Sequence, residues 1–187
     1  MNPHIRLQIL STNLIRMARS TDSFFIRQTL DLGNTNVFQQ TEIDLGAYVD
    51  ALGKSVLRIH NIQVTYSDNT GASSLIQGNE VGVAQWQLTT QSQGALIRAD
   101  NRSLVSDGRV HMFNDQGAPE LATMVTDVNG MNLHEWKNGY LIAVEQCYLG
   151  GAASTGFVGD AYVSLVIECT VETMTTASAM ALALSQQ

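Results

Sequence analysis

Residues 161–173 carry the clearest strand pattern in the chain. The odd positions from Val163 to Val171 hold apolar side chains, whereas the even positions are mostly polar. Alternation of this kind, in a run rich in β-branched residues and free of Gly and Pro, predicts a β-strand with one buried face. Such a strand is typical of an antiparallel sheet that covers a core on one side only.

A second apolar run, residues 140–149, comes shortly before the first. The two runs have similar lengths and follow one another along the chain, so we predict that they are antiparallel neighbours in one sheet. The Gly-rich residues 150–160 would form the loop between them.

The same alternation predicts further strands in the first half of the chain, at residues 24–32, 37–45, 55–66 and 81–89. Within 55–66 the apolar positions change phase at His60-Asn61. One extra residue in a strand has this effect, and we therefore predict a β-bulge at that point.

Two dipeptides indicate tight turns. Asp107-Gly108 predicts a hairpin within residues 104–113, and Asn138-Gly139 predicts a second hairpin, because both sequences suit a two-residue turn. Each turn would join two short strands.

Helices are expected in two places. Pro119 predicts the start of a helix within residues 116–126, because Pro is favoured in the first turn. The Ala- and Leu-rich residues 177–185 predict a terminal helix with Thr176 as its N-cap.

Together these patterns predict an all-β fold, namely a single eight-stranded antiparallel jelly-roll sandwich with short helices. The 187 residues are an ordinary length for one domain. We expect an N-terminal arm at residues 1–22, the β-sandwich domain at 23–175 and a helical tail at 176–187.

The composition adds information about the surface. Charged residues make up only 14% of the chain, which favours a surface partly covered by other subunits. Residues 1–27 have a net charge of +3 and the remaining residues have −10. An acidic body argues against the wrapping of nucleic acid by that body.

The basic N-terminal segment is a candidate assembly arm. Its charge would allow it to contact a membrane surface, nucleic acid or the acidic surface of neighbouring subunits. No run reaches the about 18 apolar residues of a membrane span, and no signal peptide is apparent, so we expect synthesis in a cytoplasm. The residues singled out in the arm are Arg6, Leu10, Leu14, Arg16, Met17 and Arg19.

No catalytic or cofactor-binding motif is present. His4, His60, His111 and His134 are isolated from one another in the sequence and lack the spacing of a metal site. No phosphate-binding loop or nucleophile elbow occurs. We therefore expect neither an enzyme nor a bound cofactor.

Cys147 and Cys169 each lie inside a predicted strand. Buried free thiols are favoured in a chain without a secretion signal, and a cross-strand disulfide is the alternative.

The last third of the chain resembles the C-terminal strands of small single-jelly-roll capsid proteins of marine and archaeal viruses. The resemblance rests on residues 139–151, the strand at 162–175 and the tail at 179–187. It implies a virion coat protein, made in the host cytoplasm, that assembles with copies of itself, and with other capsid proteins, into an icosahedral shell, sometimes over an internal membrane.

Two other functions are compatible with an all-β fold. A carbohydrate-binding or adhesive β-sandwich would use Trp86 or Trp136 to stack on sugars. A cupin-like enzyme would need a close pair of histidines, which the sequence lacks.

Overall fold

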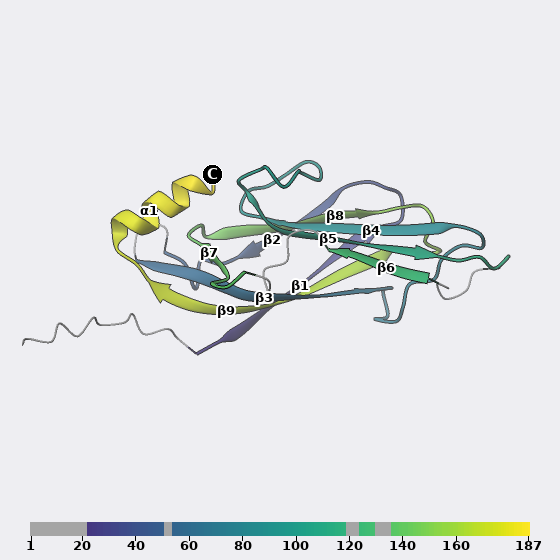
Figure 1. The fold of residues 1–187 in the computed structure, drawn as a ribbon, viewed down its shortest axis with the longest axis horizontal. Helices are drawn as coiled ribbons and strands as arrows, with labels where there is room; N and C mark the ends of the chain where they lie inside the picture. The colour runs from purple at the N-terminus through teal and green to yellow at the C-terminus, as the bar shows by residue number, and fades with distance from the viewer. Residues whose placement is uncertain (1–21, 51–53, 119–123, 130–135) are drawn as a thin grey trace, which may run out of the picture.

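The computed structural model describes residues 22–50, 54–118, 124–129 and 136–187. These residues form two antiparallel sheets that pack face to face, with one helix at one end of the sandwich (Figure 1). The all-β prediction is confirmed at this level. The described residues contain nine strands, so the predicted number of eight is not confirmed.

Sheet A has four strands and sheet B has five. In spatial order, sheet A contains β1 (Phe24–Gly33), β9 (Ala161–Thr173), β3 (Ser55–Ser67) and β7 (Tyr140–Ile142). Sheet B contains β2 (Gln39–Asp44), β8 (Gln146–Ala153), β4 (Val81–Thr89), β5 (Leu104–Phe113) and β6 (Met124–Asn129). The run with the clearest alternation is therefore β9, which lies between β1 and β3.

The strands are paired in a nested order. When β6 is set aside, β1 pairs with β9, β2 with β8, β3 with β7 and β4 with β5. A long hairpin that is folded over on itself has this pairing order, since strands are matched from the chain ends inward. β9–β3 and β8–β4 contacts then complete the two sheets.

The core lies between the sheets and confirms the predicted face of β9. Val163, Leu165, Ile167 and Cys169 are buried, and Val171 is partly buried and packs against them. Sheet B contributes buried side chains such as Trp86, Leu88 and Leu149. Burial of each large apolar side chain contributes about 1.5–3 kcal/mol to folding.

The β-bulge in β3 is also confirmed. The register between β3 and β9 shifts between Ile59 and Asn61, so that Ile59 lies opposite Cys169 and Asn61 lies opposite Glu168. His60 is the extra residue. Its side chain reaches the neighbouring strand, where its Nε2 lies 2.8 Å from Oγ1 of Thr170.

The predicted pairing of residues 140–149 with residues 161–173 is wrong. Residues 140–142 form β7 in sheet A, whereas β8 begins at Gln146 in sheet B and pairs with β2 and β4. Tertiary hydrogen bonds fix the crossing between the sheets: Ala143 N donates to Gln186 Oε1, and Leu45 N donates to Glu145 O. Alternation within the run does not reveal these distant partners.

The predicted hairpin at Asp107-Gly108 is wrong as well, because β5 runs without a break through both residues. Gly108 lies directly opposite Trp86 in β4. A Cβ atom at Gly108 would lie 2.8 Å from the indole Nε1. The glycine is therefore needed for space beside the indole, not for a turn.

Two further predictions need correction in part. The predicted loop at 150–160 is shorter, because residues up to Ala153 belong to β8. Of the helix predicted within 116–126, residues 116–118 form a bend and 124–126 belong to β6, while 119–123 lie outside the described residues.

The turn at Asn138-Gly139 is present, and Gly139 N donates to Trp136 O. Gly139 has φ +63°, a conformation that Gly adopts at little cost. The strand predicted before this turn lies outside the described residues, and the strand after it, β7, pairs with β3.

The terminal helix is α1 (Thr176–Ser185), close to the predicted range. Its N-cap is Thr175, one residue before the predicted cap, and the Thr175 hydroxyl accepts a hydrogen bond from Ser178 N. Within the part of the chain that the structure describes, there is no helix of the length and apolar character needed to cross a membrane.

Candidate functional site

The candidate arm residues cannot be placed. Arg6, Leu10, Leu14, Arg16, Met17 and Arg19 all lie outside the described residues. Their role in assembly stays a prediction. The described residues instead present two surfaces with distinct chemistry: an apolar face on α1, and a cleft beside the end of this helix.

One side of α1 packs against the end of the sandwich. Ala179 is buried with Val56 and Ala143, and Leu182 packs against this small cluster. The opposite side is exposed and carries Ala177, Met180, Ala181 and Leu184, spaced as neighbours on one helix face. Leu184 is 69% exposed, and we name this set the α1 outer face.

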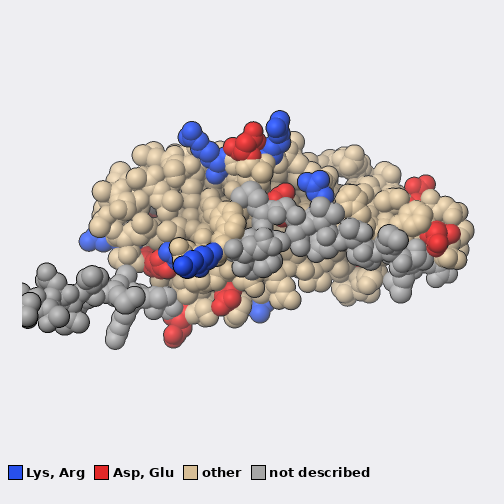
Figure 2. All heavy atoms as spheres, viewed as in Figure 1, with Lys and Arg blue, Asp and Glu red and all other residues tan. Residues whose placement is uncertain are grey.

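No charged residue of α1 lies in or next to the α1 outer face. The sequence of α1 contains no Asp, Glu, Lys or Arg, so no charged side chain of the helix itself covers its apolar groups. Figure 2 shows charged side chains of both signs scattered over the face that it draws, with large uncharged areas between them. An exposed apolar face of this kind is typical of a contact surface.

The residue after the helix holds α1 in place. Gln186 is buried, its Oε1 accepts from Ala143 N, and its Nε2 donates to Leu141 O at 2.6 Å. Its backbone O accepts from Thr90 Oγ1 at 2.7 Å. Gln186 thus joins the end of the helix to β7 and to the loop that follows β4.

A cleft of about 800 Å³ lies between β3, β9, the turn before β7 and the C-terminal end of α1. Its lining combines cationic, aromatic and amide side chains. They are Arg58, His60, Arg102, Trp136, Lys137, Asn138, Tyr140 and Glu172, together with Gly139, Leu141, Leu182, Ser185 and Gln186.

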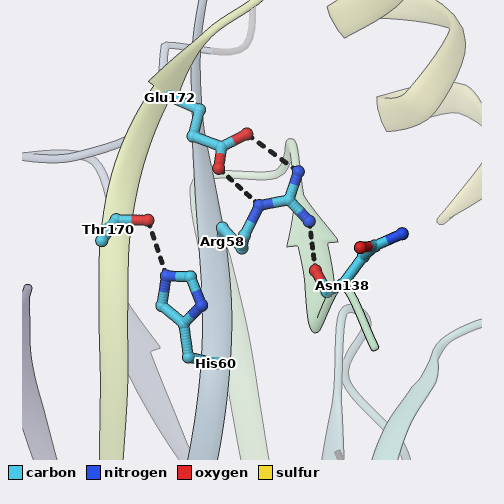
Figure 3. A network of polar contacts seen from close by, with 5 residues as sticks. All are labelled: Arg58, His60, Asn138, Thr170 and Glu172. Atoms are coloured by element: carbon cyan, nitrogen blue, oxygen red, sulfur yellow. Dashed lines mark hydrogen bonds and ion pairs between the residues drawn. The ribbon is translucent and has the colours of Figure 1, made fainter. Parts of the chain in front are cut away.

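Arg58 and Glu172 form a two-point ion pair across β3 and β9 (Figure 3). Arg58 Nε lies 2.5 Å from Oε1 and Nη2 lies 2.9 Å from Oε2 of Glu172. Arg58 Nη1 also donates to the backbone O of Asn138. The guanidinium therefore fixes the turn at 136–139 to the outer face of sheet A.

The ion pair shifts the titration of both partners. The hydrogen bond from Arg58 holds the pKa of the Glu172 carboxyl below its usual value. The same hydrogen bond raises the pKa of Arg58. Both groups are therefore charged at neutral pH, and they neutralise each other inside the cleft.

Trp136 and Tyr140 form an aromatic pair at the cleft, with ring centroids 5.8 Å apart and planes inclined by 38°. Trp136 is 39% exposed, so part of the indole face is open to a ligand. Tyr140 is partly buried, and this burial raises the pKa of its phenol. The partly buried ring of Tyr140 thus packs against the more exposed indole of Trp136.

Arg102 and Lys137 supply the cleft with charge that is not neutralised. Both side chains are exposed, and within the described ranges neither has a carboxylate partner. The cleft was not predicted from the sequence, because its residues come from five separate segments of the chain. The exposed Trp136-Lys137 pair before a Gly turn is the one local signal that could have indicated it.

The structure separates the two tryptophans that were considered for sugar binding. Trp86 is 4% exposed and belongs to the core, so it cannot stack on a ligand. The prediction that named Trp86 is wrong at this residue, because the Trp86 side chain lies on the inner face of β4, among the core residues. Trp136 is the exposed one.

Cys147 and Cys169 are free and buried, as predicted. Burial raises the pKa of each thiol to about 12. Both sulfurs therefore remain protonated at neutral pH and belong to the core.

The described histidines do not come together. His60 lies on β3 and His111 lies on β5, in different sheets. In the part of the chain that the structure describes, no three side chains of His, Cys, Asp or Glu are close enough to hold a metal ion.

No family model matches the chain, and no curated protein matches it. Three solved structures with which the chain is similar are viral capsid proteins. VP1 of Trichodysplasia spinulosa-associated polyomavirus, in complex with GM1 oligosaccharide, has 8% identity and a TM-score of 0.46, over 81% of this chain and 95% of that one.

The Desmodium yellow mottle tymovirus protein has 11% identity and a TM-score of 0.44, over 91% of this chain and 96% of that one. The Merkel cell polyomavirus VP1 unassembled pentamer has 7% identity and a TM-score of 0.38, over 80% and 95%. All three matches have low sequence identity and a TM-score below 0.5.

Proposed function

We propose that the chain is a virion coat protein that assembles with copies of itself into a shell. The eight strands other than β6 would be a single jelly roll, which their nested pairing supports. The protein would act by assembly and not by catalysis. It would be made in the host cytoplasm and reside in the virion.

The observation that carries the proposal is the α1 outer face. Burial of exposed apolar area against a partner stabilises the complex by about 25 cal/mol for each Å² removed from water. Met180 and Leu184 are the large side chains of this face, and 46% and 69% of them are exposed. For a coat protein, the partner that would cover this face is a second copy of the same chain, because many copies assemble together.

A second exposed apolar group lies at the opposite end of β9. Val81 and Phe113 face each other in register at the ends of β4 and β5. Leu75 and Val158 are hydrogen-bonded neighbours beside them, and all four are exposed. Contact between different ends of two copies is a head-to-tail contact, which repeats from copy to copy and forms a ring where the rotation between copies closes.

The proposed division of the chain follows from this assembly. Residues 23–175 would be the sandwich that forms the shell, and 176–187 the tail that offers the α1 outer face. Residues 1–22 would be the arm, with its basic and apolar side chains placed on a neighbouring subunit, a membrane surface or nucleic acid.

Light scattering after size exclusion, with electron microscopy of the same fractions, tests the proposal on the full chain. We expect large particles for the wild type and small species for a Met180→Glu, Leu184→Glu variant. Charges on this face would oppose contact between copies, while an exposed position leaves folding unchanged.

The matched control is a Thr173→Glu, Thr176→Glu variant, which adds the same charge at exposed polar positions of the same end. This control should assemble like the wild type. Particle formation by the Met180→Glu, Leu184→Glu variant would contradict the role of α1. A wild type that remains monomeric at high concentration would contradict the proposed function.

A further inference from the structure

The cleft beside α1 is a local exception to the charge of the molecule. Residues 28–187 have a net charge of −10, yet three of their six cationic side chains line this cleft. Among the described residues, Glu172 is the one carboxylate that lines it. Glu172 is paired with Arg58. The other two cations of the cleft, Arg102 and Lys137, therefore remain available for an anionic ligand.

The floor of the cleft is set before a ligand arrives. Arg58 is held on two sides, by the Glu172 carboxylate and by the backbone O of Asn138 (Figure 3). Its contact with Asn138 fixes the turn that carries Trp136 and Lys137. A turn held in this way loses little further freedom on binding.

The chemistry of the lining matches a sugar ring that carries a carboxylate. The exposed part of Trp136 offers a flat apolar surface for the C–H face of a ring. Lys137 lies next to it in the sequence and Arg102 lines the same cleft, so a carboxylate can be neutralised there. The amide of Asn138 can bond ring hydroxyls.

We propose that this cleft binds an acidic sugar unit, such as a sialic or uronic acid at the end of or within a glycan. The proposal rests on the cleft alone and does not depend on assembly. A single carboxylate matches the two cations of the cleft, Arg102 and Lys137, that have no carboxylate partner among the described residues.

A polynucleotide fits the same surface less well. Binding to nucleic acid uses about 6–10 phosphate contacts along a basic track, whereas the cleft has two free cations in the described part of the chain. Phosphates beyond the cleft would meet an acidic body. The charge distribution therefore favours a short, singly charged ligand.

The test is a titration of the full-length protein, followed by NMR saturation transfer and by calorimetry. The probes are 3′-sialyllactose, trigalacturonate and neutral lactose. We expect dissociation constants of about 1 mM for one or both acidic sugars, with lactose at least about tenfold weaker because the carboxylate contact is absent.

Variants locate the site. Trp136→Ala should weaken binding of the acidic sugar by about tenfold or more, and Trp136→Phe should restore part of it. Lys137→Gln and Arg102→Gln should weaken only the acidic sugars. Their matched controls are Lys54→Gln and Arg98→Gln, which remove the same charges outside the cleft and should leave binding unchanged.

The proposal would be overturned if lactose bound with the same affinity as the acidic sugars, or if Trp136→Ala left the affinity unchanged. It would also be overturned if neither acidic sugar bound at about 10 mM. A (dT)10 oligonucleotide that binds more tightly than the sugars, through Lys137, would assign the cleft to nucleic acid instead. Repeating the titration on the Met180→Glu, Leu184→Glu variant separates a failure of binding from a failure of assembly.

Discussion

At the scale of single residues, Trp86 shows how the core of sheet B is filled. Trp86 lies between Gly108 on β5 and Gly151 on β8, which are its register partners on either side, and its indole lies beside Gly108. Each glycine leaves the space that a side chain would otherwise take. At Gly108 this space is taken by the Trp86 indole, and at Gly151 it is taken by the backbone of β4 and by Leu32.

Substitution of Gly151 tests this packing. A Cβ there would lie 2.4 Å from the backbone O of Gln85 and 2.5 Å from Leu32 Cδ2. Because a backbone atom cannot move aside alone, Gly151→Ala should lower the free energy of unfolding by about 2–3 kcal/mol. Urea denaturation measures the change.

Gly94→Ala is the control, since a Cβ at Gly94 meets no atom within 4 Å. It should change the free energy of unfolding by less than about 0.5 kcal/mol. Equal stability of Gly151→Ala and the wild type would show that β8 and β4 are not packed as described.

The buried thiols give a second prediction at this scale. Because burial raises the pKa of Cys147 and Cys169 to about 12, a thiol reagent should not label the folded protein and should label both thiols after unfolding. Above the usual thiol pKa the unfolded state ionises first, so stability should fall in alkaline solution.

A reductant should leave the melting temperature unchanged, because the cysteines are free. A lower melting temperature on reduction would instead indicate a disulfide. Labelling of the folded protein at neutral pH would show that the thiols are accessible.

Local sequence patterns correctly predicted features that depend on a single strand, such as which face of the strand is buried. The alternation of β9 gave its buried face, and the phase change at His60 gave the bulge. The pattern failed at Gly108, where a turn signal and a need for space look alike in the sequence. The two reasons for a glycine can be distinguished only when the residue opposite it in the sheet, Trp86, is known.

At the scale of elements, the side chain of Gln186 attaches α1 to the sandwich, in addition to the apolar contacts of Ala179 and Leu182. Gln186 pairs with the backbone at Leu141 and Ala143 through its amide. Gln186→Ala would leave a buried N–H and a C=O without partners. We expect a loss of about 2 kcal/mol in the free energy of unfolding, measured by urea denaturation.

The neighbouring residue provides the control, because Gln187 is exposed. Gln187→Ala should be neutral within about 0.5 kcal/mol. If Gln186→Ala is equally neutral, α1 is held by its apolar contacts and not by this amide.

The Arg58–Glu172 pair, which joins β3 to β9, makes stability depend on pH. The folded-state pKa of Glu172 lies below its usual value of 4.5, so the pair contributes above the unfolded pKa. This contribution is lost as the pH falls through the folded-state pKa. Glu172→Gln should therefore cost about 1 kcal/mol near pH 7, and this cost should shrink as the pH falls below 4.5 and through the folded-state pKa.

Urea denaturation across this pH range measures the difference between the two proteins. Glu168→Gln is the control, since it removes a carboxylate from the same strand without removing a described ion pair. A constant difference between wild type and Glu172→Gln at all pH values would contradict this account of the pair.

The order of elements was harder to predict than their presence. Residues 140–149 looked like one strand because Ala143 and Val144 continue the apolar run. The chain crosses between sheets there through bonds to Leu45 and Gln186, which are remote in sequence. The cleft follows the same rule, since tertiary structure alone brings Arg58, Trp136 and Glu172 together.

At the scale of the whole molecule, the sandwich and the proposed arm should be separable. Residues 1–20 lie outside the described part, while the described strands already enclose a core. We expect a chain without residues 1–20 to stay folded and soluble but to lose assembly, because the arm would no longer reach its neighbour. Circular dichroism and light scattering report the two properties.

An unfolded truncated chain would show that the arm packs on its own domain. A truncated chain that still forms particles would remove the arm from the proposed assembly. Since the Met180→Glu, Leu184→Glu variant tests the other end of the chain, the two experiments together locate the contacts between copies.

The nested pairing also determines when the protein can fold. Thr29 and Ser164, which bond across β1 and β9, are 135 positions apart, and contacts of such high contact order form slowly. Because β9 is the last of the described strands along the chain, sheet A lacks one of its two inner strands until residues 161–173 have been synthesised. The earlier strands of sheet A have unpaired edges until then, so this sheet can be completed only after β9 has been made. The α1 outer face comes after β9 in the chain, so subunits can associate through it only when the domain itself is complete.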